Sequence, residues 1–167
     1  LQVDDKKLVE LNIQDSKKRG ATIIENTKVI NVKRDKNEWN IYLDNNSIIK
    51  TKVLINAAGP WINDVLSKVI KIDSKKPIRL VKGSHIITKR LYDKKKAFTL
   101  QNEDNRIVFV IPYKEKYSLI GTTETEVFSP ESPQIDEKEI NYLISTVNKY
   151  FINQISKEEI ISTYSGI

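Results

Sequence analysis

Residues 53–61 constrain the fold of this chain more than any other part of its sequence. An apolar run at 53–55 is followed by Asn56-Ala57-Ala58-Gly59 and then by Pro60-Trp61. Proline is well tolerated in the first turn of a helix. The order therefore predicts a strand, a tight turn almost without side chains, and a helix. Backbone N–H groups at such a turn can approach an anion closely, and small residues there also allow tight packing. Spacing alone favours neither interpretation.

The segments before this junction predict a helix and a β-meander. Asp4 or Asp5 can cap a helix that Gly20 ends. Residues rich in β-branched side chains then predict a short strand and three further strands joined by polar turns. These four predicted strands cover residues 21–24, 28–33, 38–43 and 47–56.

The second half of the chain predicts a largely antiparallel sheet with a helix on one face. Asp136 opens the helix, and Glu139 stands three residues later, the spacing of a capping box. The fold class is therefore α+β, with one domain over residues 1–70 and another over 71–167. The predicted strands cover residues 78–88, 97–100, 106–113, 117–123 and 160–164.

Composition excludes several classes of function. The 167 residues are 39% hydrophobic and 30% charged, which indicates a globular chain rather than a disordered one. There is no cysteine and one histidine, so a disulfide framework, a thiol nucleophile and a metal site are not expected. The net charge of +6 comes from lysines mixed with acidic residues, without the interleaved aromatic residues of a stacking surface. We therefore expect no nucleic-acid partner.

Lys82-Gly83-Ser84-His85 interrupts the strand at 78–88. Glycine inside a strand marks a bulge or a place where a ligand comes close. Strand alternation puts Gly83 and His85 on the same face, so a ligand over the glycine could touch the imidazole. A buried structural histidine explains the same pattern, and the residues alone favour that explanation.

Two further places could contribute to a ligand site. Arg106 could bind an anion, although a salt bridge with Glu103 or Asp104 is favoured. The segment 121–124 contains Thr123 and could lie beside the same ligand as His85, or form an ordinary bulge. No G-x-G-x-x-G, P-loop or Ser/His/Asp set occurs.

Several stretches together carry a family resemblance. They are residues 3–9, 54–61, 78–85, 100–112, 120–124, 139–143 and 163–166. In order and spacing they resemble the quinone-linked, FAD-dependent glycerol-3-phosphate dehydrogenases, which have the D-amino-acid-oxidase fold. The segments around Lys82-Gly83-Ser84-His85 and 101–112 are the most specific.

The resemblance implies that residues 1–70 belong to an FAD-binding domain and residues 71–167 to a substrate-binding domain. The implied reaction oxidises sn-glycerol 3-phosphate to dihydroxyacetone phosphate, with hydride transfer to FAD and electrons passed to quinone. The implied location is cytoplasmic, on the inner face of the cell membrane and in contact with its surface. The implied catalytic residue is His85, which also binds substrate with Lys82, Gly83, Ser84, Arg106 and Thr123. The implied cofactor-binding residues are Val29, Asn56, Ala57, Ala58, Gly59 and Trp61.

The departures from the family pattern lead to a further expectation. The G-x-G-x-x-G that seats FAD is missing, as are an Arg expected after Ser165-Gly166-Ile167 and a later Gly-Gly-Lys segment. We therefore expect an internal fragment that is inactive alone and binds FAD weakly or not at all. The alternatives are another oxidase of the same fold, a stand-alone binding module, and a degraded gene product.

Overall fold

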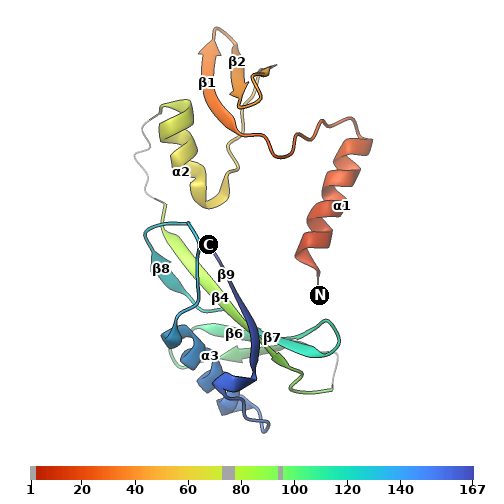
Figure 1. Cartoon of the computed structure of the whole chain (residues 1–167), viewed down its shortest axis with the longest axis vertical. Helices are drawn as coiled ribbons and strands as arrows, with labels where there is room; N and C mark the ends of the chain where they lie inside the picture. Colours follow the sequence, from red (N-terminus) through yellow and green to blue (C-terminus); the bar gives the residue numbers. More distant parts are fainter. Residues whose placement is uncertain (1–2, 73–77, 94–95) are drawn as a thin grey trace. The chain divides into compact units, whose positions relative to one another are not determined.

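The computed structural model describes residues 3–72, 78–93 and 96–167. The chain divides into two compact units, Leu1–Pro77 and Ile78–Ile167, coloured red to yellow and green to blue in Figure 1. The boundary predicted after residue 70 lies seven residues before this division.

The first unit opens with helix α1 (Asp5–Lys18), as the sequence predicts. The Asp4 carboxylate accepts a hydrogen bond from the Lys7 backbone N–H, and Gly20 follows the helix with a φ of +93°. Left-handed backbone of this kind is where glycine is favoured over other residues. None of the residues of α1 is buried. The helix is therefore specified by its ends rather than by packing in this unit.

The predicted meander is confirmed, with two corrections. Strands β1 (Val29–Asp35), β2 (Glu38–Leu43) and β3 (Ile48–Thr51) form an antiparallel sheet in that order. The strand predicted at 21–24 is wrong, because those residues form no strand. The last predicted strand also ends at Thr51 rather than Asn56. β-Branched residues favour extended backbone, but a strand needs a neighbour for its hydrogen bonds, and neither segment has one within the described residues.

A helical stretch closes the core of the first unit. It comprises η1 (Gly59–Trp61), α2 (Ile62–Asp64) and the π-helical turn η2 (Val65–Ile70). Its last residues, Val69 and Ile70, pack against the buried side chains of the meander, while Trp61 is 44% exposed. The predicted helix after Pro60 is thus confirmed. The buried side chains at the centre of this core are Val32, Ile41 and Leu43.

The second unit is built on one antiparallel sheet, as predicted. The central strand β4 pairs with β7, β8 and β9, and all pairings are antiparallel. The sheet order is β5-β6-β7-β4-β8, with β9 paired to β4. The strands are β4 (Leu80–Lys89), β5 (Phe98–Gln101), β6 (Ile107–Tyr113), β7 (Tyr117–Gly121), β8 (Thr125–Val127) and β9 (Ile160–Gly166).

Helix α3 (Glu137–Tyr150) covers one face of this sheet. The capping box predicted from Asp136 and Glu139 is present, with each side chain accepting from the backbone N–H of the other. Leu143 and Val147 of α3 are fully buried against the sheet, and the short helix η3 (Lys157–Glu159) precedes β9. The sheet residues in this core with no exposed surface are Ile86, Val108, Val110 and Ile120. No helix within the described ranges is both long and apolar enough to cross a bilayer.

Candidate functional site

Strand β4 has two different faces. Lys82 and Ser84 are buried on the face that meets α3, whereas Gly83 and His85 lie on the opposite, more open face. The alternation follows from the pleat of a strand, which sends successive side chains to opposite sides. The predicted substrate-binding segment 82–85 is therefore divided between a buried network and a surface.

The imidazole of His85 is held between two neighbouring strands. His85 pairs with Gly121 of β7 and with Tyr164 of β9. Its ring is stacked on the Tyr164 ring, with the centroids 4.6 Å apart and 6° between the planes. A Cβ at Gly121 would lie 2.2 Å from His85 Cδ2, which is closer than real side chains approach. Gly121 is therefore glycine because the His85 ring lies over it.

The protonation of His85 is set by its surroundings. Its Nδ1 is buried and has no hydrogen-bond partner among the described residues. Desolvation lowers the pKa of His85 below its ordinary value of 6.5, because burial disfavours the charged imidazolium. The ring is consequently neutral at neutral pH and can accept a proton.

The space above Gly83 is filled by a neighbouring side chain. A Cβ at Gly83 would lie 2.5 Å from Thr122 Oγ1 and 3.6 Å from the carbonyl oxygen of Thr123. Thr122, rather than an open gap, therefore covers this glycine. Thr122 belongs to the segment 121–124 that the sequence indicates as a neighbour of His85, although only Thr123 of that segment is predicted to bind substrate.

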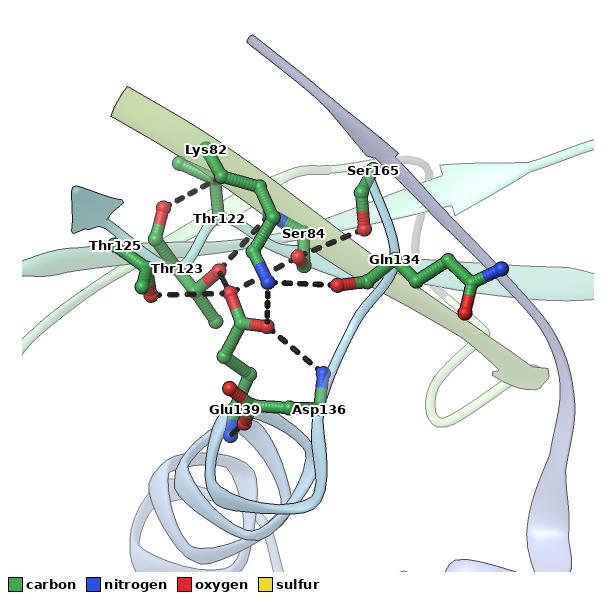
Figure 2. A network of polar contacts seen from close by, with 9 residues as sticks. All are labelled: Lys82, Ser84, Thr122, Thr123, Thr125, Gln134, Asp136, Glu139 and Ser165. Atoms are coloured by element: carbon green, nitrogen blue, oxygen red, sulfur yellow. Dashed lines mark hydrogen bonds and ion pairs between the residues drawn. The ribbon is translucent and has the colours of Figure 1, made fainter. Parts of the chain in front are cut away.

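Beneath the sheet, Lys82 forms a buried ion pair with Glu139 of α3. Lys82 Nζ lies 2.8 Å from Glu139 Oε2 and also donates to the carbonyl oxygen of Gln134 at 2.6 Å. The side chains are 9% and 5% exposed, respectively. A charge this far from water needs a partner, and each of the two residues provides one for the other. Figure 2 shows this pair at the centre of a larger network.

The other oxygen of Glu139 accepts hydrogen bonds from three hydroxyl groups. Oε1 accepts from Thr123 at 2.6 Å, from Ser84 at 3.0 Å and from Thr125 at 3.2 Å. Ser84 Oγ also lies 2.8 Å from Ser165 Oγ on β9. Lys82, Ser84 and Thr123, all predicted to bind substrate, thus point to Glu139 and away from the His85 face. In the sequence, Glu139 stands out only as part of the capping box and as the first residue of the segment 139–143 of the resemblance.

The network keeps Glu139 ionised. Burial alone would raise the pKa of this carboxyl group, but the hydrogen bonds that it accepts outweigh the burial. They come from Lys82, Thr123, the Asp136 backbone N–H and Ser84, and they lower the pKa to about 2. Glu139 is therefore a carboxylate throughout the physiological range.

Arg106 is engaged near the surface. Its Nε donates to Asp104 Oδ2 at 2.7 Å, which confirms the expected salt bridge, and its guanidinium lies 4.1 Å from the centroid of the Tyr142 ring. Asn102 Nδ2 donates to the Tyr142 hydroxyl at 2.9 Å and to Thr146 Oγ1 at 3.2 Å. The segment 101–106, one of the most specific parts of the resemblance, therefore anchors the loop before β6 to α3.

The predicted cofactor residues gather around one cavity in the first unit. The cavity has a volume of about 500 Å³, and its lining includes five of the six predicted residues. Those five are Val29, Asn56, Ala57, Ala58 and Trp61. Gly59 is not part of the lining and has a φ of +55° within the turn.

Asn56 shapes the turn beside this cavity. Its Nδ2 donates to the carbonyl oxygen of Ile62 at 3.1 Å, and its Oδ1 accepts from the Ala58 backbone N–H at 3.3 Å. The small Ala57 and Ala58 side chains leave the turn backbone open beside apolar walls. This combination fits part of a flavin nucleotide, which has a flat ring system and polar edges. Within the residues that the structure describes, no group of His, Cys, Asp or Glu side chains could hold a metal ion.

Comparison with known proteins identifies the class. Residues 1–167 match the model of the DAO family, described as FAD dependent oxidoreductase, and the chain belongs to that family. The expected resemblance to glycerol-3-phosphate dehydrogenases is confirmed by its curated relatives. The chain is 38% identical over 171 residues to the aerobic glycerol-3-phosphate dehydrogenase of Escherichia coli K12, covering 99% of this chain and 34% of the relative.

Two further relatives match the chain at similar identity over the same length. The glycerol-3-phosphate dehydrogenase of Pseudomonas tolaasii is 41% identical over 170 residues, covering 99% of this chain and 33% of the relative. The D-erythritol 1-phosphate dehydrogenase of Brucella abortus is 37% identical over 171 residues, covering 99% of this chain and 34% of the relative. The chain thus spans about a third of the length of these proteins.

Solved structures agree on the fold. The glycerol-3-phosphate dehydrogenase of Bacillus halodurans, solved with FAD, matches with a TM-score of 0.83 and 24% identity, covering 99% of this chain and 35% of that one. A glycine oxidase from Bacillus cereus matches with a TM-score of 0.66 and 18% identity, covering 95% of this chain and 42% of that one.

Proposed function

We propose that the complete protein carrying this chain oxidises sn-glycerol 3-phosphate to dihydroxyacetone phosphate, with FAD as the hydride acceptor and quinone as the electron acceptor. The observation that carries the proposal is the match to two glycerol-3-phosphate dehydrogenases at 38% and 41% identity along 99% of the chain. FAD, when bound, supplies the group that takes up the hydride. The chain's own residues supply positioning and proton transfer.

His85 is the residue that fits proton transfer. Loss of hydride from an alcohol carbon leaves the hydroxyl proton to be removed, and a neutral imidazole is a suitable acceptor. Burial lowers the pKa of His85, so its neutral form is available at neutral pH. The Tyr164 ring, 4.6 Å away and nearly parallel, limits the orientations that the imidazole can adopt.

The lining of the cavity in the first unit fits the cofactor. Ala57 and Ala58 carry little side chain, so a flat ring system can approach the turn backbone, and Val29 supplies apolar contact. The two hydrogen bonds of Asn56 fix the backbone conformation of the turn. In this proposal these residues hold part of FAD.

The proposed electron acceptor implies a location. Quinones dissolve in the bilayer, so a protein that reduces them has to reach the membrane surface. Glycerol 3-phosphate is a charged metabolite of the cell interior. We therefore place the complete protein in the cytoplasm, at the inner face of the cell membrane.

A second polyol phosphate is the alternative substrate. The Brucella abortus relative, named D-erythritol 1-phosphate dehydrogenase, is 37% identical, nearly the same as the Escherichia coli relative at 38%. Both substrates carry a phosphate group and an oxidisable alcohol, so a neutral His85 would serve either. The likeness to glycine oxidase, at 18% identity, concerns the fold and favours no amino-acid substrate.

A substrate panel tests the proposal. The complete protein, purified with FAD, is mixed with an artificial electron-accepting dye and with sn-glycerol 3-phosphate, D-erythritol 1-phosphate or glycine. Fastest reduction with sn-glycerol 3-phosphate supports the proposal. Preference for D-erythritol 1-phosphate would replace the substrate but keep the class. Reduction by glycine alone would overturn the proposal.

A further inference from the structure

We propose that Glu139 is a positioning residue for His85, because its carboxylate fixes the buried side of the strands whose open side carries the imidazole and its neighbours. The inference rests on the proposed function only in giving His85 a catalytic role. It also provides a second use for a residue that the capping box of α3 already explains.

Side chains from several elements meet at one oxygen of Glu139. Glu139 Oε1 accepts from Ser84 on β4, from Thr123 after β7 and from Thr125 on β8. Through the contact between the Ser84 and Ser165 hydroxyls it is also linked to β9. The close view in Figure 2 shows Ser84, Thr123 and Thr125 converging on the carboxylate, with Ser165 joined to Ser84. One carboxylate thereby joins several elements that are far apart in the sequence.

The opposite face of the same strands carries the stacked rings of His85 and Tyr164. His85 directly follows Ser84, and Tyr164 directly precedes Ser165. Successive side chains of a strand point to opposite sides, so fixing Ser84 and Ser165 from below also fixes the two stacked rings above. The register agrees, because Ser84 pairs with Ser165 and His85 pairs with Tyr164.

The His85 ring is held by packing rather than by a hydrogen bond at Nδ1. Its Nδ1 has no hydrogen-bond partner among the described residues, so no bond at that atom fixes the ring. The ring depends on packing against Tyr164 and on the bare backbone of Gly121. Such packing is sensitive to small strand shifts, since side chains in close contact tolerate little displacement.

Glu139 acts by positioning and not by direct contact with substrate. Both oxygens of Glu139 are fully engaged: Oε1 accepts three hydroxyl groups, while Oε2 accepts the Asp136 N–H and faces Lys82 Nζ. The residue is also 5% exposed. It therefore has no free acceptor for a substrate and acts through the strands it holds.

The test measures the reactivity of the His85 ring in the complete protein. Diethyl pyrocarbonate modifies neutral, accessible imidazoles, and peptide mass spectrometry reports the rate at His85 separately from other sites. Ser165→Ala removes the hydroxyl contact between β4 and β9 while leaving their backbone pairing in place, and Glu139→Gln weakens the whole network. We expect a roughly fivefold faster modification of His85 in each variant, the effect of losing about one hydrogen bond.

Two further variants complete the test: Ser162→Ala as a control and Thr125→Val as a second change in the network. Ser162→Ala makes the same change at an exposed position of β9 and should leave the His85 rate unchanged. Glu139→Gln leaves Lys82 with a weaker partner and can fail to fold. If Glu139→Gln does not fold, the modification rates of the Ser165→Ala and Thr125→Val variants test the inference instead. Folded variants of Ser165 and Thr125 that modify at the wild-type rate would overturn the inference.

Steady-state kinetics distinguish positioning from a purely structural role, because a purely structural role leaves kcat per flavin unchanged. With sn-glycerol 3-phosphate, Ser165→Ala should lower kcat by a larger factor than it raises KM, because the imidazole is misplaced while binding groups remain. If the variant only reduces the amount of folded, flavin-loaded protein, the apparent kcat falls in proportion to the flavin content. An unchanged kcat per flavin would therefore contradict the inference. If the wild-type protein does not oxidise this substrate, the proposed function fails, and the modification rates still test the positioning.

Discussion

The imidazole of His85 lies nearly parallel to the ring of Tyr164, with 4.6 Å between the ring centroids and 6° between the planes. The two residues pair across β4 and β9, so the stack is a direct product of strand register. Stacked aromatic pairs restrict each other's orientation beyond what burial alone achieves. The stack therefore restricts the orientation of the imidazole that, in the proposed function, accepts the proton.

Replacing Tyr164 tests the importance of this stack. Tyr164→Ala removes the ring, and we expect kcat per flavin to fall by roughly tenfold, as an aromatic pair contributes up to about 1.5 kcal/mol. Tyr164→Phe keeps the ring and is the matched control. Steady-state kinetics with sn-glycerol 3-phosphate measures both. If the alanine and phenylalanine variants lose activity equally, the hydroxyl rather than the stack is what matters.

The pH dependence of the reaction should reflect His85. Desolvation lowers its pKa, so the imidazole stays neutral to a lower pH than an exposed histidine with a pKa of 6.5. A proton acceptor works only when unprotonated, so kcat/KM should be constant at neutral pH and decline below 6.5 as the ring becomes charged. A decline that begins above this value would argue against burial as the dominant influence.

Gly121 should tolerate no side chain. A Cβ there would lie 2.2 Å from His85 Cδ2 and 2.8 Å from Nε2, so Gly121→Ala has to displace the ring. We expect kcat to fall by about tenfold or more, because the displaced ring is the proposed proton acceptor and misplacing such a group is costly. Gly166→Ala is the control, since nothing lies within 4 Å of a Cβ at that position. Equal kinetics for the two variants would show that the ring can move without consequence.

Acid should weaken the second unit through Glu139. Its pKa is about 2 in the folded chain against 4.5 ordinarily, so its stabilising contribution is complete above 4.5 and disappears as the pH falls through about 2. The loss corresponds to roughly 3 kcal/mol. Urea unfolding followed by circular dichroism at a series of pH values measures it.

The comparison needs a control for general acid effects. Glu139→Gln cannot titrate, so a folded variant should lack this part of the pH dependence. Glu137→Gln changes an exposed residue of the same helix and should keep it. An unchanged acid profile in Glu139→Gln would mean that the buried pair contributes little to stability.

Most of the fold follows from local patterns in the sequence. The capping box at Asp136 and the glycine after α1 fix helix ends, and these signals need no tertiary context. The strand predicted at 21–24 fails because propensity does not provide a partner strand. The apolar segment 53–55 fails in the same way: it has no partner strand within the described residues and forms no strand, and Ile55 is 81% exposed.

The candidate site was only partly predictable. Period-two alternation correctly separates His85 from Ser84, but it does not reveal what lies under each face. Lys82 forms an ion pair with Glu139, which lies 57 positions later in the sequence, and only the packing of α3 against β4 brings the two together. For the same reason Tyr164 gives no sign in the sequence that its ring meets His85. Contacts between distant segments are decided by topology rather than by local spacing.

Reduction of the bound flavin by sn-glycerol 3-phosphate without oxygen tests the central claim most directly. Rapid mixing of the complete, FAD-loaded protein with substrate follows the loss of flavin absorbance in one turnover. We predict rapid reduction in the wild type and a rate about 10²-fold or more lower in His85→Asn, at equal flavin content. A wild-type flavin that sn-glycerol 3-phosphate does not reduce, or a His85→Asn protein that reduces as fast as the wild type, would contradict the account.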